Sequence, residues 1–144
     1  MTVWIVVADA ARARFLAADK PNAVLMEIED RVHYASRLHA RDLESERAPR
    51  VHDSHGLGRH AIEPATDVKT IEAEAFAREV CHHLEESRNA GRFQKLYLIA
   101  APQFLGLLRG GLSQGVKNLV AGEMDKNLTQ HSLTDIRGQL PQYL

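Results

Sequence analysis

A run of six apolar residues near the start of the chain constrains the fold more than any other feature. Residues 3–8 read Val-Trp-Ile-Val-Val-Ala, with no polar side chain on either face of an extended segment. A strand of this composition is buried on both faces and lies in the interior of its sheet. The run ends at Asp9, too early for a signal-peptide core with its cleavage site or for a membrane span. We therefore expect a central strand, a cytoplasmic location and no insertion into a membrane.

Two further strands are predicted directly after the first. An apolar segment resumes at residues 13–18, after a polar break, and predicts a hairpin partner for residues 3–8. Val24, Met26 and Ile28 then alternate with other side chains, which is the period of a half-buried strand. Because short turns join the three segments, they should pair as an antiparallel meander.

The second half of the chain predicts helices and strands in alternation. From residue 67 the apolar side chains Ala73, Phe76, Ala77, Val80 and Leu84 recur at helical spacing, and Gly91 suits the stop of that helix. The elements expected after it are a strand at 95–101, a short helix at 104–108 interrupted by Gly110 and Gly111, a helical turn at 113–118, a strand at 119–125, and a terminal helix capped by Ser132.

This order of elements is typical of an α/β fold. We predict a single-domain ribonuclease H-like or Rossmann-like sandwich, in which a mixed sheet of about five strands has helices on its flanks. The antiparallel meander should lead into a βαβ crossover with parallel strands. The 144 residues are enough for one domain, so we take 1–144 as a single unit.

Charge and cysteine content exclude some classes of protein. Eighteen Lys and Arg stand against nineteen Asp and Glu, for a formal net charge of −1, so the chain is not globally basic as many nucleic-acid-binding domains are. Cys81 is a single cysteine, which excludes an intramolecular disulfide framework and fits a reducing compartment.

Residues 37–65 differ from the rest of the chain and predict a long polar loop. They are rich in arginine and acidic residues, contain four of the eight histidines, and include helix-breaking residues such as Gly56, Gly58, Pro49 and Pro64. Loops of this length are functional or disordered, so this segment is the first place to look for activity.

Arginines in this loop and in the first hairpin form a candidate binding surface. The planar guanidinium pairs with phosphate through two hydrogen bonds, which favours RNA as a partner. The alternative is that these arginines form ordinary solvated ion pairs with neighbours such as Glu44 and Glu46. The candidate binding residues are Arg12, Arg14, Arg47, Arg50, His52, His55, Arg59 and His60.

Three histidines at close spacing raise the question of a metal site. His52, His55 and His60 offer imidazole nitrogens of the kind that bind zinc. The spacing matches no established metal-binding motif, and histidines on a glycine-rich loop are more typical of exposed side chains. We therefore predict neither a metal nor a cofactor and keep these residues as weak candidates.

Asp9 follows the predicted central strand and has two interpretations. Two-metal hydrolysis of phosphodiesters needs several converging carboxylates, and Asp125 and Asp135 are the partners that the chain offers. In the other interpretation Asp9 shapes the hairpin turn by accepting backbone hydrogen bonds, and we favour this one.

Several motifs together resemble a known family. They are Val3 to Phe15 (VWIVVADAARARF), Ser45 to Arg50 (SERAPR), Phe76-Ala77, Ala101 to Arg109 (APQFLGLLR) and Glu123 to Thr129 (EMDKNLT). This combination resembles the bacterial host-attachment protein family, whose members are described as required for attachment to host cells. The family is in turn distantly similar to the central domain of archaeo-eukaryotic release factor and Pelota proteins. That similarity implies an α/β sandwich and an association with RNA or the ribosome, and it brings no catalytic residues.

Two hypotheses for the function follow. The first is a non-catalytic cytoplasmic binding domain, indirectly needed for host attachment, whose partner is RNA, the ribosome or a protein. The second is a metal-dependent nuclease or other hydrolase that uses Asp9 with other carboxylates or with the loop histidines. A homodimer also suits so small an α/β domain.

Overall fold

The computed structural model describes residues 1–20, 22–33 and 58–144, and of residues 58–67 it describes the backbone alone. Within these ranges the chain forms strands and helices in a regular succession. They are β1 (Val3–Ala8), β2 (Arg12–Ala18), β3 (Met26–Val32), α3 (Gly58–Asn89), β4 (Lys95–Ala100), α4 (Pro102–Gly111), α5 (Gln114–Lys117), β5 (Val120–Met124) and α6 (Leu133–Gln139).

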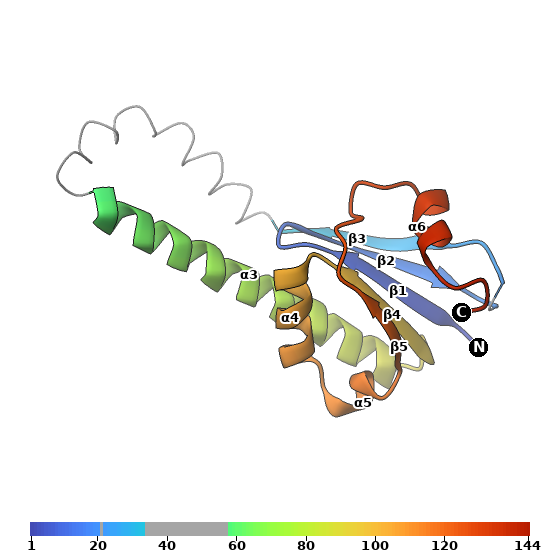
Figure 1. Ribbon diagram of the computed structural model, residues 1–144. Helices are drawn as coiled ribbons and strands as arrows, with labels where there is room; N and C mark the ends of the chain where they lie inside the picture. The colour runs from blue at the N-terminus through green and yellow to red at the C-terminus, as the bar shows by residue number, and fades with distance from the viewer. Residues whose placement is uncertain (21, 34–57) are drawn as a thin grey trace.

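The strands form one mixed sheet in the order β3-β2-β1-β4-β5 (Figure 1). β1 pairs antiparallel with β2, and β2 pairs antiparallel with β3, as expected for a meander. β4 lies parallel to β1 on its other side, and β5 lies parallel to β4. These pairings confirm the predicted α/β sandwich, and all six residues of β1 are buried, as its composition predicts.

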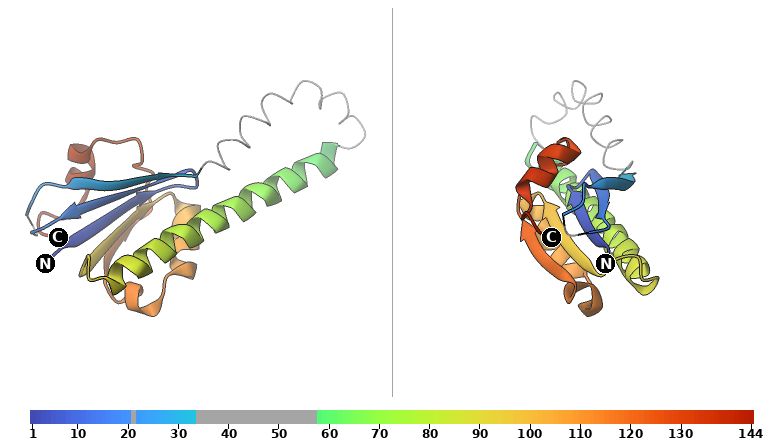
Figure 2. Two further views of the ribbon diagram at one scale, coloured as in Figure 1. Left: turned by 180° about the vertical axis from the view of Figure 1, so that it is seen from behind. Right: turned by 90° about the vertical axis from the view of Figure 1, so that its right-hand side faces the viewer.

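The two faces of the sheet are covered by different parts of the chain. Alternate residues of β1, among them Trp4 and Val6, pack with α3, α4 and α5 in one core. The others, Val3, Ile5 and Val7, pack in a second core with the C-terminal segment, to which α6 belongs. The end-on view shows α3 on one side of the sheet and α6 on the other (Figure 2).

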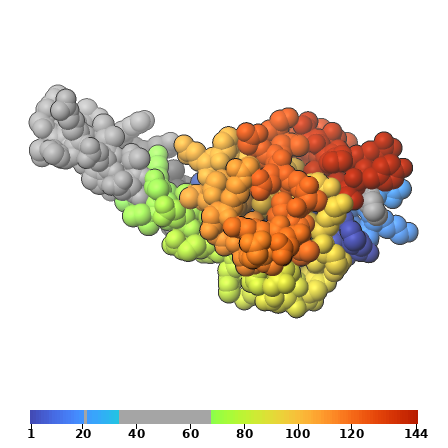
Figure 3. Space-filling model, turned by 60° about the horizontal axis from the view of Figure 1, so that its bottom comes forward, coloured from blue at the N-terminus to red at the C-terminus, as the bar shows by residue number. Residues whose placement is uncertain are grey.

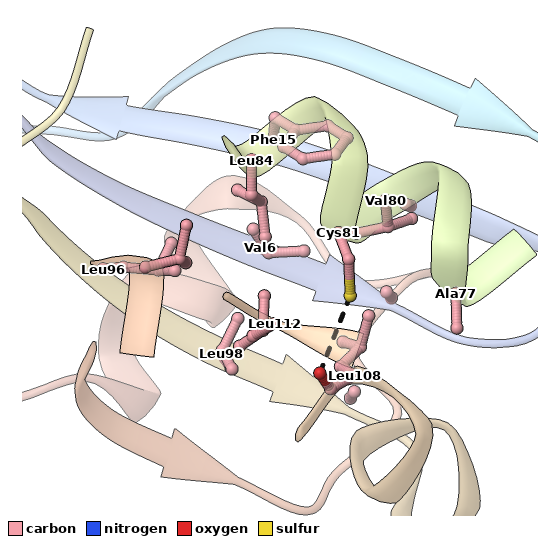
Figure 4. Close-up of a cluster of buried hydrophobic side chains, with 14 of the residues drawn as sticks. Val6, Phe15, Ala77, Val80, Cys81, Leu84, Leu96, Leu98, Leu108 and Leu112 are labelled. Atoms are coloured by element: carbon pink, nitrogen blue, oxygen red, sulfur yellow. Dashed lines mark hydrogen bonds between the residues drawn. The ribbon is translucent and has the colours of Figure 1, made fainter. Parts of the chain in front are cut away.

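The long helix α3 provides most of the cover on the first face. Its predicted apolar side is confirmed, since Phe76, Ala77, Val80 and Leu84 are all buried. Cys81 lies on the side of this helix that faces α4, and its thiol donates to the carbonyl oxygen of Leu108 at 3.6 Å (Figure 4). In the space-filling view, α4, α5 and the second half of α3 form one continuous surface (Figure 3).

Helix caps fix where three of the helices begin or end. Gly91 has a φ of +71° just beyond α3, the left-handed conformation predicted for that position. The hydroxyl of Ser132 accepts from the backbone N–H of Asp135 at 3.1 Å and caps α6, also as predicted. Ser113 caps α5 in the same way, by accepting from Val116.

The predicted boundary of the polar loop at residue 65 is wrong. α3 begins at Gly58, so its first turns occupy the last part of the segment predicted as a loop. Pro64 disfavours a helix at this position, but a proline removes only one backbone hydrogen bond, and the alanines and the glutamate beside it favour a helix. The remaining loop positions from 37 to 57 lie outside the described residues.

Two smaller expectations are also corrected. α4 continues through Gly110 and ends at Gly111, so these glycines do not interrupt it. β3 is not half-buried in the predicted way, because Val24, Met26 and Ile28 are 82%, 62% and 42% exposed. β3 is an edge strand and has a strand neighbour on one side within the described sheet, which leaves its apolar side chains less covered than those of an inner strand.

The described ranges contain no helix that is both long enough and apolar enough to cross a membrane.

Candidate functional site

Asp9 shapes the turn between β1 and β2, as the favoured interpretation predicts. Its Oδ1 atom accepts from the backbone N–H groups of Ala11 and Arg12 at 2.8 and 2.9 Å. The backbone N–H of Asp9 donates to the carbonyl oxygen of Arg12 at 2.9 Å and closes the turn. One carboxylate oxygen is therefore used within the hairpin itself.

The second oxygen of Asp9 contacts a segment far away in the sequence. Its Oδ2 atom accepts from the side-chain amide of Asn127 and from the hydroxyl of Thr129, both at 3.1 Å. Asn127 Oδ1 in turn accepts from the backbone N–H of Thr129 at 3.2 Å, and Thr129 is 1% exposed. Asp9 thus ties the first hairpin to the segment that follows β5.

Arg12 forms a two-pronged ion pair with the edge strand. Its Nε and Nη2 atoms donate to the two carboxylate oxygens of Asp30 on β3, at 2.9 and 2.7 Å. These hydrogen bonds hold the pKa of the Asp30 carboxyl below its ordinary value. The remaining nitrogen, Nη1, donates to the carbonyl oxygen of Thr129 at 3.2 Å.

Arg14 makes a similar set of contacts in a more buried place. Its side chain is 8% exposed and pairs with Glu27 Oε1 at 2.6 Å. Its Nη1 atom donates to the carbonyl oxygens of Thr129 and His131, at 3.2 and 2.7 Å. A buried guanidinium needs such partners, because an unpaired charge at this depth would cost several kcal/mol.

We call the seven residues joined in this way the Asp9 network: Asp9, Arg12, Arg14, Glu27, Asp30, Asn127 and Thr129. Its two arginines face two carboxylates of β3, and both oxygens of Asp9 are engaged by donors from the protein. A carboxylate beside an arginine is a poor ligand for a divalent cation, since the two positive charges repel. The arrangement is that of a structural tie between the hairpin, the edge strand and the C-terminal segment.

The other carboxylates of the nuclease hypothesis are not joined to this network. Asp125 follows β5, which β4 separates from β1 in the sheet. The side chain of Asp135 lies in the first turn of α6, is 66% exposed, and has His131 Nδ1 at 3.9 Å. The described part of the chain contains no group of three or more His, Cys, Asp or Glu side chains that could hold a metal ion.

The remaining candidate residues fall in the segment that was predicted as a loop. Arg47, Arg50, His52 and His55 lie outside the described residues. Arg59 and His60 belong to the first turn of α3, where the backbone alone is described. Binding of phosphate, RNA or a metal by these residues stays a prediction. The same holds for Arg12 and Arg14 as binding residues, which would first have to release the ion pairs described above.

A second polar cluster, which sequence reasoning missed, lies between β3 and α3. The Nε2 atom of His83 is 3.2 Å from Glu29 Oε2, and its Nδ1 atom is 3.3 Å from Arg31 Nη2. Arg31 donates, so Nδ1 accepts and the proton of the neutral ring sits on Nε2, facing the carboxylate. Glu29 and Arg31 lie two residues apart on one face of a strand, and this spacing is the feature of the sequence that could have predicted the cluster.

Aromatic rings surround His83 on its remaining sides. The ring stacks on Trp4 with centroids 6.0 Å apart and meets the edge of Phe15 at 4.7 Å. Removal from water disfavours the charged imidazolium, and this burial lowers the pKa of His83. The cluster therefore joins the edge strand to α3 through a neutral histidine.

The two segments joined by the Asp9 network lie near the two ends of the part of the chain that matches a known family. A family model described as "Protein required for attachment to host cells" matches residues 4–140. The chain belongs to the host-attachment protein family. An uncharacterized protein of Rickettsia prowazekii (strain Madrid E) is 39% identical to it over 74 residues, a stretch that makes up 50% of this chain and 49% of that protein. The chain thus matches about half the length of this relative.

Membership of the host-attachment family confirms the resemblance drawn from the motifs. The more distant similarity to release factor and Pelota proteins, with the RNA or ribosome association that it implies, stays a prediction.

Proposed function

We propose that this member of the host-attachment family is a non-catalytic binding domain that supports attachment by binding a protein partner. The family description supplies the link to attachment. The observation that supports a non-catalytic domain is the Asp9 network, whose polar groups form hydrogen bonds and ion pairs with one another. The protein would act in the cytoplasm, and its role in attachment would be indirect.

The Asp9 network supports a scaffold better than a catalytic centre. A general base or a metal ligand needs a free lone pair directed at the substrate or the metal. Both oxygens of Asp9 instead accept hydrogen bonds, from Ala11 and Arg12 on one side and from Asn127 and Thr129 on the other. The motif residues near the two ends of the chain are thereby used to hold the fold.

The edge strand β3 and the turn before it offer a surface for a protein partner. Val24, Met26 and Ile28 are large apolar side chains, all exposed, within five consecutive residues. Clustered apolar exposure of this kind is typical of interaction sites. The three carboxylates of β3 are each paired with an arginine, Asp30 with Arg12, Glu27 with Arg14 and Glu29 with Arg31, so a partner that covers β3 does not leave an unpaired carboxylate cut off from water.

A photo-crosslinking amino acid at position 26 tests the class of partner. We expect a protein adduct in cells that survives ribonuclease treatment, and no such adduct when the same group is placed at position 71, an exposed site on α3. An adduct that disappears after ribonuclease treatment would favour RNA or the ribosome and would contradict the proposal.

An attachment assay tests whether the surface matters for function. In cells that lack the endogenous protein, the double variant Met26→Lys/Ile28→Lys should fail to restore attachment. The matched control is Ile71→Lys, which alters an equally exposed apolar side chain elsewhere. Both variants must show the circular dichroism spectrum and abundance of the unaltered protein. Full attachment with the double variant would refute the role assigned to β3.

A further inference from the structure

A hollow of about 450 Å³ lies beside β4 and β5, on the face of the sheet that the C-terminal segment covers. Its volume is within the roughly 300–1,000 Å³ of small-molecule pockets. The apolar part of its wall consists of Ile99 from β4, Met124 from β5, and Leu140 and Pro141 after α6. β5 and β3 are the two edges of the sheet, so the hollow is at the opposite edge from the exposed side chains of β3 (Figure 1).

Gly122 opens the floor of the hollow. It lies opposite Tyr97 in the pairing of β4 with β5, and a Cβ atom there would lie 3.1 Å from two atoms of the Tyr97 ring. Leu98 and Glu123 also line the hollow. Their side chains are directed to the other face of the sheet, where Leu98 belongs to the first core and Glu123 pairs with Arg109 of α4. The floor is therefore made of peptide groups, against which a flat ring can lie.

Two polar side chains complete the wall. Tyr97 is 8% exposed, and its hydroxyl forms no hydrogen bond with the described residues and is not sealed from solvent. The side-chain oxygen of Gln139 accepts from Lys126 at 3.0 Å, which leaves the amide nitrogen of Gln139 as a donor. A hydroxyl and an amide can together bond to an uncharged group that both donates and accepts.

The wall offers no charge for an ionic ligand. Among the described residues that line the hollow none is cationic, so an anion would lose its hydration without gaining a partner. The one carboxylate, that of Glu123, already accepts from two nitrogens of Arg109, at 2.7 and 2.6 Å. A cation would therefore find this charge balanced, and an uncharged ligand pays the smallest desolvation cost.

We propose that this hollow binds a small, uncharged, flat aromatic molecule that carries a carboxamide or a similar hydrogen-bonding group. The ring would lie over the peptide groups at Gly122, between the Tyr97 ring and the thioether of Met124, both of which contact aromatic rings favourably. The carboxamide would bond to the hydroxyl of Tyr97 and the amide of Gln139. This inference is independent of the protein partner proposed for β3.

Titration of the full chain with 1-naphthamide, followed by ¹⁵N–¹H NMR spectra, tests the proposal. We expect saturable shifts of the amide signals of residues 97, 122, 124 and 140. The anion 1-naphthoate and the cation 1-naphthylmethylammonium have nearly the same shape and should each bind at least about tenfold more weakly. Absence of saturable shifts, or binding of either ion as tight as that of the amide, would overturn the proposal.

Two variants with matched controls test the assigned contacts. Tyr97→Phe removes one hydroxyl and should weaken naphthamide binding about three- to tenfold, the equivalent of one neutral hydrogen bond, whereas Tyr143→Phe, at an exposed tyrosine outside the hollow, should not weaken it. Gly122→Ala should weaken binding by narrowing the floor, and Gly106→Ala, which meets open space, should not. A Gly122→Ala protein that fails to fold leaves the hydroxyl test in place.

Unchanged binding by folded Tyr97→Phe protein would overturn the proposal. So would a doubled mass by sedimentation together with broadening of the same amide signals, because a second copy of the chain would then cover the hollow.

Discussion

Replacement of Asp9 by alanine measures how much the Asp9 network stabilises the fold. The change removes an acceptor from four donors: the backbone N–H groups of Ala11 and Arg12, the amide of Asn127 and the hydroxyl of Thr129. The two backbone groups resemble those at a helix N-cap, where loss of the capping side chain costs about 1 kcal/mol.

The contacts with Asn127 and Thr129 add to this cost. Thr129 is buried but keeps Asn127 Oδ1 as an acceptor at 2.7 Å, and the amide of Asn127 can turn to water. Each lost bond is therefore worth the ordinary net value of about 0.5–1.5 kcal/mol rather than a full desolvation penalty. The Asp9→Ala variant should lower the free energy of unfolding by about 2–4 kcal/mol in total.

Urea denaturation followed by circular dichroism is the assay, and Asp135→Ala is the matched control. The side chain of Asp135 is 66% exposed, so its removal should change the free energy of unfolding by less than about 0.5 kcal/mol. A double-mutant cycle of Asp9→Ala with Thr129→Val should give a coupling energy of about 1 kcal/mol, since the two side chains touch. A loss below about 0.5 kcal/mol for Asp9→Ala would refute the structural role given to the network.

Three further predictions concern Gly115, His83 and Cys81. A Cβ at Gly115 would lie 2.6 Å from Arg88 Cζ, but this guanidinium is the far end of a flexible side chain and can move aside, so Gly115→Ala should change the free energy of unfolding by less than about 0.5 kcal/mol in urea denaturation; Gly106→Ala, which meets open space, should not destabilise the protein either. Burial lowers the pKa of His83, so stability should be full above the unfolded-state pKa of about 6.5 and decline as the pH falls toward the folded-state value; a His83→Gln variant with the same decline would contradict this. Burial raises the pKa of Cys81 to about 11, so iodoacetamide at pH 8 should modify the thiol slowly in the folded protein and rapidly in urea; equal rates would show that the thiol is exposed.

The sequence predicted the parts of the fold that depend on local pattern. The apolar run at residues 3–8 indicated a strand with neighbours on both sides, and β1 pairs with both β2 and β4. Asp9 in its turn, Gly91 after α3 and Ser132 before α6 were also predicted, because each acts on backbone groups within three residues.

The pairs in the Asp9 network could not be predicted in the same way. The position of Glu27 relative to Arg14 depends on an irregularity in the register between Phe15 and Leu16, which nothing in the residue pattern marks. The contact of Asp9 with Thr129 joins positions 120 residues apart and requires the path of the chain after β5. The first turns of α3 were not predicted, because Pro64 disfavours a helix there although the residues beside it stabilise one.

The central claim, that this family member binds rather than catalyses, is tested most directly by the Asp9→Asn variant in the attachment assay. The amide keeps an acceptor for Ala11 and Arg12 and removes the negative charge that metal-dependent chemistry needs. At normal abundance and with a folded spectrum, this variant should restore attachment, whereas Met26→Lys/Ile28→Lys should not. A folded Asp9→Asn protein that fails to restore attachment, beside a double variant that succeeds, would contradict the account.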